Sequence, residues 1–286
     1  MLRDYLEIAK PGIIAGNLVS MAGGFFLASR GRADLPGLAA TLCGICFVVA
    51  SGCVFNNYID RDLDRTMKRT CNRALARGGL PVGACLLYGG GLGIAGFSLL
   101  GFAVNFLTFS VALAGFSIYV GIYSLLLKRA SVYATFVGSL AGAAPPLAGY
   151  CAAANRFDTG ALLLLAIFIL WQIPHYYSIA IFRFDDYCAA QIPILPVKRG
   201  IAVAQKHIAG YIIAFIVASS MLTLFGYTGL PYLAVTTLSG LAWLFTALWG
   251  CNGCKDGLWA GRLYFFSILT VLVLSFMMSV DFRGAG

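Results

Sequence analysis

About nine stretches of roughly twenty mostly apolar residues follow one another along the chain, each long enough to cross a bilayer as a helix. The windows are 11–29, 36–57, 81–103, 106–127, 131–153, 160–182, 208–228, 231–250 and 262–280. They take up most of the 286 residues and leave no room for a separate soluble domain. We therefore expect a single all-α, polytopic membrane domain over residues 1–286, because helices satisfy their backbone polar groups inside lipid.

The composition and the distribution of charge agree with this interpretation. Hydrophobic residues make up 60% of the chain and charged residues 11%, and the 34 glycines suit close helix packing in lipid. The net charge of +9 could suggest nucleic acid as a partner. When successive loops are assigned to alternate sides, however, 16 of the 20 Lys and Arg share one side, all but Arg30, Arg32, Arg156 and Arg283. The excess of Lys and Arg therefore reports the orientation of the chain in the membrane. We expect the lipid bilayer as a partner, and no nucleic acid.

The same rule predicts the orientation. Lys- and Arg-rich loops stay inside, so the N-terminus is expected in the cytoplasm and the C-terminus in the periplasm. The first ten residues show neither a secretory pattern nor an Arg- and Ser-rich presequence, which favours the bacterial inner membrane over an organelle.

An acidic motif directly follows the second apolar window. Asn57, Asp60 and Asp64 stand at i, i+3 and i+7, so one continuous helix would present all three side chains on one face. Oxygen ligands gathered in this way suit Mg²⁺, which proteins usually hold with one or two carboxylates plus substrate phosphates. An ordinary charged loop between two spans is the alternative, but it explains regularly spaced acids at a membrane surface less well.

Further polar residues are expected on the same side, because the even-numbered windows all end there. These window ends carry Asn57, Asp60 and Asp64, then Tyr123, Lys128 and Arg129, and finally Arg183, Asp185 and Asp186. Eight of the 11 acids fall on this side, although the positive-inside rule makes no demand on acids. We therefore predict a functional site at the boundary between the membrane and the cytoplasm.

The chemistry predicted for this site is prenyl transfer. Carboxylates from loops 61–80 and 183–207 could hold Mg²⁺ against a diphosphate from opposite sides and make it a good leaving group. An allylic carbocation would follow, and aromatic side chains in a water-poor pocket would shield it. The cations expected to neutralise the diphosphate oxygens are Arg61, Lys68, Arg69, Lys128, Arg129, Arg183 and Lys198.

The acceptor is expected deeper in the membrane, on the sixth window. His175 lies roughly 10 Å below the end of that window by helix rise. A buried imidazole needs a partner, and its structural role would be to bond a carbonyl freed by Pro174. Its functional roles would be to bind a metal centre, steer a carboxylate or move a proton. Trp171 and Tyr176 could stack on a large flat ligand, although such aromatic residues are more often plain packing.

At these residues the chain resembles the UbiA-type intramembrane prenyltransferases, and within them a heme-modifying branch. The segments that carry the match are 57–64, 123–129, 142–150, 171–176 and 185–197. The resemblance implies nine helices around a central cavity and Mg²⁺-assisted transfer of farnesyl from farnesyl diphosphate to a vinyl group of heme B, with addition of water. It also suggests heme A synthase or terminal-oxidase assembly factors as partners.

The residue patterns and the resemblance together predict the site. The catalytic residues are expected to be Asp60, Asp64, His175 and Asp186. The metal is expected among Asn57, Asp60, Asp64, Asp185 and Asp186. The substrates are expected to contact Asn57, Arg61, Lys68, Arg69, Tyr123, Lys128, Arg129, Trp171, Gln172, Tyr176, Arg183, Asp185 and Lys198.

One departure from the superfamily concerns the second acidic motif. That motif is often Asp-x-x-x-Asp, whereas Asp185 and Asp186 are followed at four residues by Ala189 and Ala190. The sequence does not decide which of the two adjacent acids faces the diphosphate.

Alternative functions stay open at this stage. The acceptor could be a quinone-ring precursor or a chlorophyll-type alcohol, the chain could be a transporter or channel, or it could carry heme without catalysis. Against a transporter, the ionisable groups crowd one surface instead of the bilayer midplane.

Overall fold

The computed structural model describes residues 2–32, 34–249 and 257–283, and its regular secondary structure over these residues is helical throughout. The all-α prediction is confirmed. Eight helices in the described part of the chain are long and apolar enough to cross a membrane. They are α2 (Pro11–Ser29), α3 (Leu35–Ile59), α5 (Val82–Ala103), α6 with η1 (Phe106–Phe116, Ser117–Leu127), α9 (Thr159–Phe182), α12 (Ile201–Leu224), α13 (Leu230–Leu248) and α14 (Gly257–Val280).

The predicted fifth window is not a single helix. It divides at Ala143 into α7 (Ala134–Gly142) and α8 (Ala144–Ala154), each too short to span a bilayer alone. The physical reason is the Pro145–Pro146 pair, because proline is tolerated in the first turn of a helix and disrupts its interior. Pro174, in contrast, lies inside α9 without ending it. The prediction of nine spans therefore becomes eight continuous helices and one broken pair.

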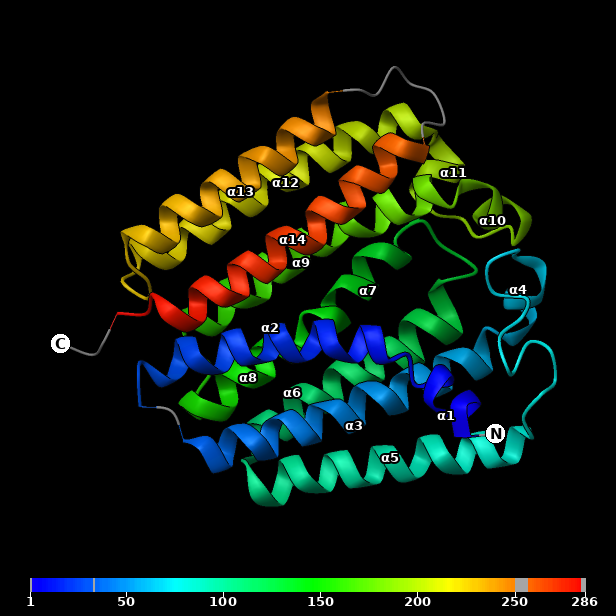
Figure 1. Ribbon diagram of the computed structural model, residues 1–286, viewed down its shortest axis with the longest axis horizontal. Coiled ribbons are helices and arrows are strands. Elements are labelled where there is room, and N and C mark those ends of the chain that lie inside the picture. Colours follow the sequence, from blue (N-terminus) through cyan, green and yellow to red (C-terminus); the bar gives the residue numbers. More distant parts are fainter. Residues whose placement is uncertain (1, 33, 250–256, 284–286) are drawn as a thin grey trace.

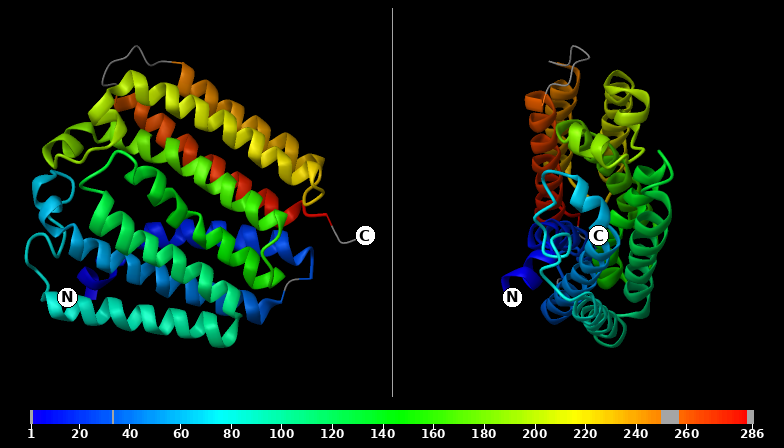
Figure 2. Two further views of the ribbon diagram at one scale, coloured as in Figure 1. Left: turned by 180° about the vertical axis from the view of Figure 1, so that it is seen from behind. Right: turned by 90° about the vertical axis from the view of Figure 1, so that its right-hand side faces the viewer.

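The helices form a closed ring (Figures 1 and 2). Neighbouring helices along the chain pack side by side, and α14 returns to α2, so that the last span contacts the first. The contact between α2 and α8 is especially close. A Cβ added at Gly24 would lie 2.1 Å from the carbonyl oxygen of Pro146, and one added at Gly149 would lie 2.0 Å from that of Met21. Glycine is therefore required where these two backbones meet.

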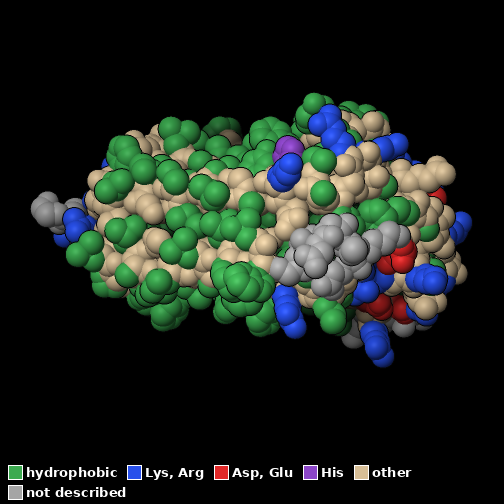
Figure 3. All heavy atoms as spheres, turned by 90° about the horizontal axis from the view of Figure 1, so that it is seen from above, with side chains coloured by type: hydrophobic (Ala, Val, Ile, Leu, Met, Phe, Trp, Pro, Cys, Tyr) green, Lys and Arg blue, Asp and Glu red, His purple; other side chains and the backbone are tan. Residues whose placement is uncertain are grey.

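Four short helices gather at one end of the ring, which we call the loop end. They are α1 (Leu2–Ile8), α4 (Arg61–Thr66), α10 (Phe184–Ala189) and α11 (Leu195–Arg199). In Figure 1 this end is on the right, and Figure 3 shows acidic and basic side chains together there, beside an apolar middle. The opposite end carries the turn after α2 and the C-terminal end of α14.

Candidate active site

Asp60 lies at the loop end, where α3 stops and α4 begins. Its backbone leaves helical geometry (φ −88°, ψ 1°), so the segment from Asn57 to Asp64 is not the single continuous helix that the spacing predicted. The side chain is 2% exposed. Its Oδ2 accepts a hydrogen bond from Asn56 Nδ2 at 2.7 Å and pairs with Lys128 Nζ.

The other carboxylate oxygen of Asp60, Oδ1, is buried and has no hydrogen-bond partner among the described residues. A buried acceptor without a partner bears a desolvation cost that a bound cation or donor would remove. This oxygen therefore fits Mg²⁺, a hard ion that prefers oxygen ligands. The described residues contain no group of three or more His, Cys, Asp or Glu able to hold a metal alone. Substrate oxygens would have to complete the coordination.

Asp64 and Asn57 have partners within the protein. Asp64 is 5% exposed, and both of its carboxylate oxygens accept from Arg73 Nη1 at 2.9 Å. Asn57 Nδ2 donates to the carbonyl oxygens of Ile8 at 2.7 Å and Cys53 at 3.0 Å, which ties α1 to α3. Arg73 is an addition to the predicted site, because a cation nine residues after Asp64 has no regular spacing in the sequence that would reveal it.

Lys10 is a second addition. It lies between α1 and α2 in a left-handed conformation (φ 57°), and its Nζ donates to Asn56 Oδ1 at 2.7 Å. Asn56 thus connects Lys10 to Asp60. The pKa of Lys10 is lowered to about 8, mainly by burial and also by the positive charges of Arg73 and Lys128, while Cys53 and Asp60 act in the opposite direction. The available sequence signal was a lysine directly before Pro11, at the start of the first span.

The two predicted acidic loops meet. The backbone N–H of Lys68 donates to Asp186 Oδ1 at 2.9 Å, and Met67 forms a small apolar cluster with Ala190 and Ile192. Figure 1 shows α4 and α10 facing each other at this end. Asp186 is half-buried at the contact, whereas Asp185 is exposed. Of the two acids, Asp186 is therefore the one that faces the first loop.

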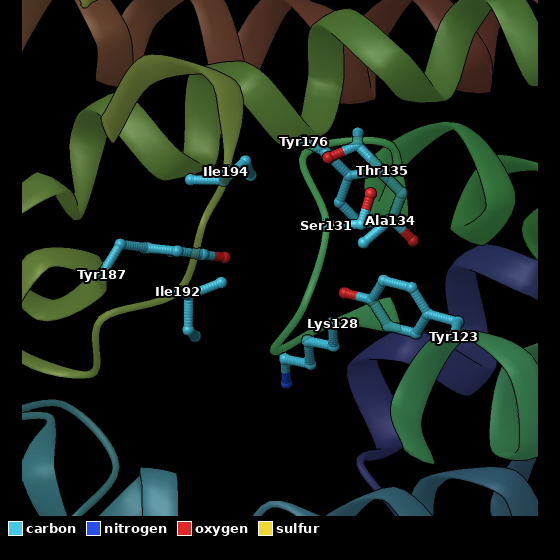
Figure 4. Close-up of a pocket in the computed structure, with 9 residues that line it drawn as sticks. All are labelled: Tyr123, Lys128, Ser131, Ala134, Thr135, Tyr176, Tyr187, Ile192 and Ile194. Carbon is cyan, nitrogen blue, oxygen red and sulfur yellow. The ribbon is translucent and has the colours of Figure 1, made fainter. Parts of the chain in front are cut away.

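A pocket opens between the end of η1 with the start of α7 and the loop that contains α10 (Figure 4). Tyr123 and Lys128 line one side, and Tyr187 and Ile192 line the opposite side, with their side chains directed into the gap. Burial raises the pKa of Tyr187, so its hydroxyl stays protonated and can donate a hydrogen bond. The pocket therefore joins the Lys128–Asp60 pair to α10.

Two of the predicted phosphate-binding cations hold the end of α3 instead of facing the pocket. Arg129 pairs with Asp62 through two hydrogen bonds of 2.6 and 2.7 Å and also donates to the Ile59 carbonyl. The hydrogen bonds from Arg129 lower the pKa of Asp62 to about 2. Arg61 stacks on the ring of Tyr58 at 4.3 Å and donates to its carbonyl oxygen.

The other predicted cations lie on exposed surface at the loop end. The guanidinium of Arg183 stacks over the Phe182 ring at 4.4 Å. Lys68, Arg69 and Lys198 are exposed. Among these, Arg69 is near enough to affect Tyr187 electrostatically, which places it beside the pocket.

His175 has a partner on α14. Its Nδ1 lies 2.7 Å from Ser267 Oγ, and the Ser267 hydroxyl itself donates to the carbonyl of Tyr264 at 2.5 Å. Because a hydroxyl has a single proton, Ser267 must accept from His175, and Nδ1 carries the imidazole proton in this network. Nε2 is then left as an acceptor. The expected structural role, a bond to a carbonyl freed by Pro174, is not the one found.

Trp171 and Gln172 complete the region around His175. The Trp171 ring stacks on the imidazole with centroids 4.9 Å apart, and its Nε1 donates to the Ser267 carbonyl at 2.7 Å. Gln172 is buried, and its Oε1 has no hydrogen-bond partner among the described residues. A Cβ added at Gly142 would lie 2.1 Å from Gln172 Oε1, so glycine makes room for this amide where α7 ends.

Several side chains that protein surrounds still keep accessible surface. They are Tyr119, Tyr123, His175 and Tyr176. Of these four, Tyr123 and Tyr176 line the pocket at the loop end. Tyr119 was not among the predicted site residues, because it is one of many aromatic residues in an apolar window.

The chain matches the model of the UbiA prenyltransferase family over residues 17–276. Among solved structures, it resembles a digeranylgeranylglyceryl phosphate synthase with a TM-score of 0.77 and 16% identity, covering 97% of this chain and 98% of that one. It also resembles a UbiA homologue from Archaeoglobus fulgidus bound to GPP and Mg²⁺, with a TM-score of 0.75 and 17% identity over 96% and 99% of the two chains. At these identities the similarity establishes the fold.

Curated relatives are much more similar in sequence. Protoheme IX farnesyltransferase of Chromohalobacter salexigens is 58% identical over 99% of this chain and 96% of its own length. The enzymes of the same name from Serratia proteamaculans and Cronobacter sakazakii are 56% and 58% identical, with the same two coverages. The chain is thus a multi-pass membrane protein that belongs to the UbiA prenyltransferase family, in its protoheme IX farnesyltransferase branch.

Proposed function

We propose that this enzyme transfers the farnesyl group of farnesyl diphosphate to a vinyl group of heme B, with addition of water, to give heme O and diphosphate. The name and high identity of the relatives support the two substrates. The observation that carries the proposal is the meeting of two acidic loops, with Asp186 bonded to the Lys68 amide, near a pocket lined by Lys128, which itself pairs with buried Asp60.

Asp60 and Asp186 would hold Mg²⁺ from the two loops. The ion would supply positive charge to the diphosphate oxygens as they gain electrons. Lys128 pairs with Asp60, and Lys10 bonds Asn56, which itself donates to Asp60, so both cations would bind the same headgroup. Arg73 holds Asp64 at 2.9 Å, so we assign Asp64 a positioning role within the first loop.

The reaction balances in four steps. The bond between farnesyl C1 and oxygen breaks, and diphosphate leaves with the electron pair. The vinyl π electrons then form a bond to C1 and leave a cation beside the porphyrin ring. Water adds to that cation and loses a proton. Tyr123, Tyr176 and Tyr119 would stabilise the positive charge through their ring faces and exclude other water.

His175 would act on the acceptor side. With its proton on Nδ1 and directed at Ser267, the imidazole offers a lone pair on Nε2 and no donor there. In this tautomer it could bind a metal centre or accept a proton at Nε2, whereas donation from Nε2 to a propionate would need the other tautomer or an imidazolium. Trp171, stacked on the imidazole, and Gln172, with its unpaired Oε1, would contact the same acceptor.

We further propose the orientation and location that the charge distribution predicts. The loop end, which carries most of the Lys and Arg, would face the cytoplasm of a bacterium. The site would then lie on the cytoplasmic side and the C-terminus in the periplasm. Association with heme A synthase or with terminal-oxidase assembly factors stays a prediction from family resemblance.

The test is a reconstituted transfer assay. Protein in lipid nanodiscs with heme B, labelled farnesyl diphosphate and Mg²⁺ should release diphosphate and form a more apolar heme. The same assay with a quinone-ring precursor or a chlorophyll-type alcohol in place of heme should give no product. Product from either of those acceptors, and none from heme B, would overturn the proposed acceptor.

An isosteric pair of variants tests the metal-binding carboxylate. Asp60→Asn should lower turnover by about 10²–10³-fold, the range typical of removing one electrostatic group from a transition state. Asp34→Asn, at the opposite end of the ring, serves as the matched control and should keep wild-type turnover. Unchanged transfer by Asp60→Asn would contradict the metal role, and heme binding indifferent to both donor and Mg²⁺ would point to a heme carrier.

A further inference from the structure

The pocket between η1, α7 and α10 is lined by hydroxyl groups. Four of them come from four different helices: Tyr123 from the π-helix η1, Thr135 from α7, Tyr176 from α9 and Tyr187 from α10. A fifth belongs to Ser131, which precedes α7. Figure 4 shows the hydroxyls of Tyr123 and Tyr187 directed into the gap from opposite sides. Polar side-chain ends from distant parts of the chain thus converge on one small space.

These hydroxyls have free hydrogen-bonding capacity. Over the residues that the structure describes, the hydroxyls of the three tyrosines and of Thr135 make no hydrogen bond to the protein. Thr135 is nevertheless only 5% exposed, so it lies away from bulk solvent. Ser131 Oγ accepts from the Tyr133 N–H at 3.1 Å and keeps its own proton free to donate. Enclosed hydroxyls without a protein partner are typically satisfied by a bound water or by a ligand.

The pocket suits water better than a charged group of a substrate. Its volume is about 30 Å³, and a cavity needs at least about 10–15 Å³, with two to four polar partners, to hold one water. The one cation among the described residues that line it, Lys128, is already paired with Asp60. Neutral hydroxyls can both donate to a water and accept from it, whereas a carboxylate or phosphate would use only their donor side. One or two waters therefore match both the size and the chemistry of this space.

The pocket borders both sides of the proposed reaction. On one side, Lys128 pairs with Asp60, which is proposed to hold the diphosphate through Mg²⁺. On the other side, Tyr176 lies next to His175, with ring centroids 5.8 Å apart, and His175 is assigned to the acceptor. In the proposed reaction the vinyl group lies between these two sides, because it must reach farnesyl C1. A water in the pocket is thus beside the place where the cation forms.

We propose that this pocket holds the water that adds to the acceptor, and that the hydroxyls of Thr135 and Tyr187 bind and orient that water. The inference rests on the proposed transfer reaction and assigns residues to its hydration step. Once farnesyl C1 has bonded to the outer vinyl carbon, the inner vinyl carbon is a cation. A lone pair of the water oxygen forms the C–O bond, and the proton that the water loses passes through the pocket to solvent. Without a bound water, the cation would instead lose a proton from the neighbouring CH₂ group and form a C=C bond, which gives an alkene lighter by one water.

The experiment measures how the product divides between these two outcomes. Wild-type enzyme and variants in nanodiscs receive heme B, farnesyl diphosphate and Mg²⁺, mass spectrometry separates the hydrated product from the alkene, and released diphosphate is measured in parallel. Thr135→Val keeps the shape of the side chain and removes its hydroxyl, so it should raise the ratio of alkene to hydrated product by about fivefold, the effect of losing one ordinary hydrogen bond. Tyr187→Phe should act in the same direction. Thr135→Ser keeps the hydroxyl and should retain the wild-type ratio.

Thr246→Val is the matched control. Thr246 lies on α13, and its hydroxyl donates to the Ala242 carbonyl at 2.9 Å, so its loss should leave the product ratio unchanged. A wild-type ratio in active Thr135→Val and Tyr187→Phe enzymes would overturn the inference while leaving farnesyl transfer intact, and so would slower diphosphate release at an unchanged ratio. Absence of any prenylated heme with the wild-type enzyme would instead refute the proposed function, and the hydration step with it.

Discussion

The residues of the candidate site divide into those proposed to bind substrate and those that hold other residues. Asp60 keeps an unpartnered oxygen and Lys128 borders the pocket, so both are available to substrate. Arg73 and Arg129 are engaged with Asp64 and Asp62. Charge and position in the sequence do not distinguish these two groups, since any of the cations could have reached a phosphate.

The pH dependence of the reaction tests the assignment of Lys10. Burial lowers the pKa of this amine to about 8, so its positive charge is present below that pH and is lost as the pH rises through it. The profile of kcat/KM for farnesyl diphosphate, which reports the free enzyme, should therefore fall above pH 8. In Lys10→Arg the guanidinium stays charged, and this basic limb should disappear. An identical limb in both enzymes would exclude Lys10 as its source.

Ser267 offers a test of the imidazole orientation. Ser267→Ala removes the acceptor that holds the Nδ1 proton of His175, so kcat/KM for heme B should fall by about tenfold, as for other residues that orient a functional histidine. The KM for farnesyl diphosphate should not change. The control is Ser279→Ala on the same helix, because the Ser279 hydroxyl donates to the Ser275 carbonyl within that helix. Equal losses in both variants would indicate a general packing effect.

At the scale of elements, hydrophobic length predicted most of the fold. The window at 11–29 matches α2, and the window at 160–182 differs from α9 by one residue. The window at 208–228 misses the first seven residues of α12, because polar Gln205, Lys206 and His207 hide that start. The π-helix could not be predicted, since apolar length does not reveal the hydrogen-bonding period.

Some residues of the candidate site have a local signal in the sequence, and others have none. Regular spacing predicted Asp60 as a site residue, whereas the adjacent Asp185 and Asp186 could not be told apart from the sequence; in the structure Asp186 is the one that accepts from the Lys68 amide. The spacing singled out Asn57, which holds α1 in the structure, and so gave no reason to choose its neighbour Asn56. Tertiary contacts between loops far apart in the chain have no local signal.

The glycine contact between α2 and α8 makes a prediction about stability. Gly149→Ala places a methyl group 2.0 Å from the Met21 carbonyl oxygen, and the two backbones must separate. Overpacking of this kind typically costs about 1–3 kcal/mol, which should appear as a lower midpoint in a thermal unfolding assay in detergent. Gly90→Ala on α5 meets no atom within 4 Å and should not lower the midpoint. A wild-type midpoint for Gly149→Ala would contradict the close packing.

At the scale of the whole molecule, the ring of helices brings together residues more than a hundred positions apart. Lys68 and Asp186 belong to different halves of the chain and meet at the loop end, and the contact between α14 and α2 closes the ring of helices. The site lies at the loop end, where charged side chains gather (Figure 3), and Tyr123 of η1 and Tyr176 of α9 line its pocket (Figure 4). Headgroup and tail of a lipid-like donor would thus find polar and apolar surroundings along one path.

The central claim, that Asp60 and Asp186 hold one diphosphate between them, is tested most directly by a double-mutant cycle. Calorimetry would measure the affinity of Mg²⁺ and a non-hydrolysable farnesyl thiodiphosphate for the wild type, Asp60→Asn, Asp186→Asn and the double variant. A shared headgroup predicts a coupling free energy of about 1 kcal/mol or more between the two substitutions. Losses that add to within about 0.5 kcal/mol would show that the two carboxylates act independently, and would contradict the account.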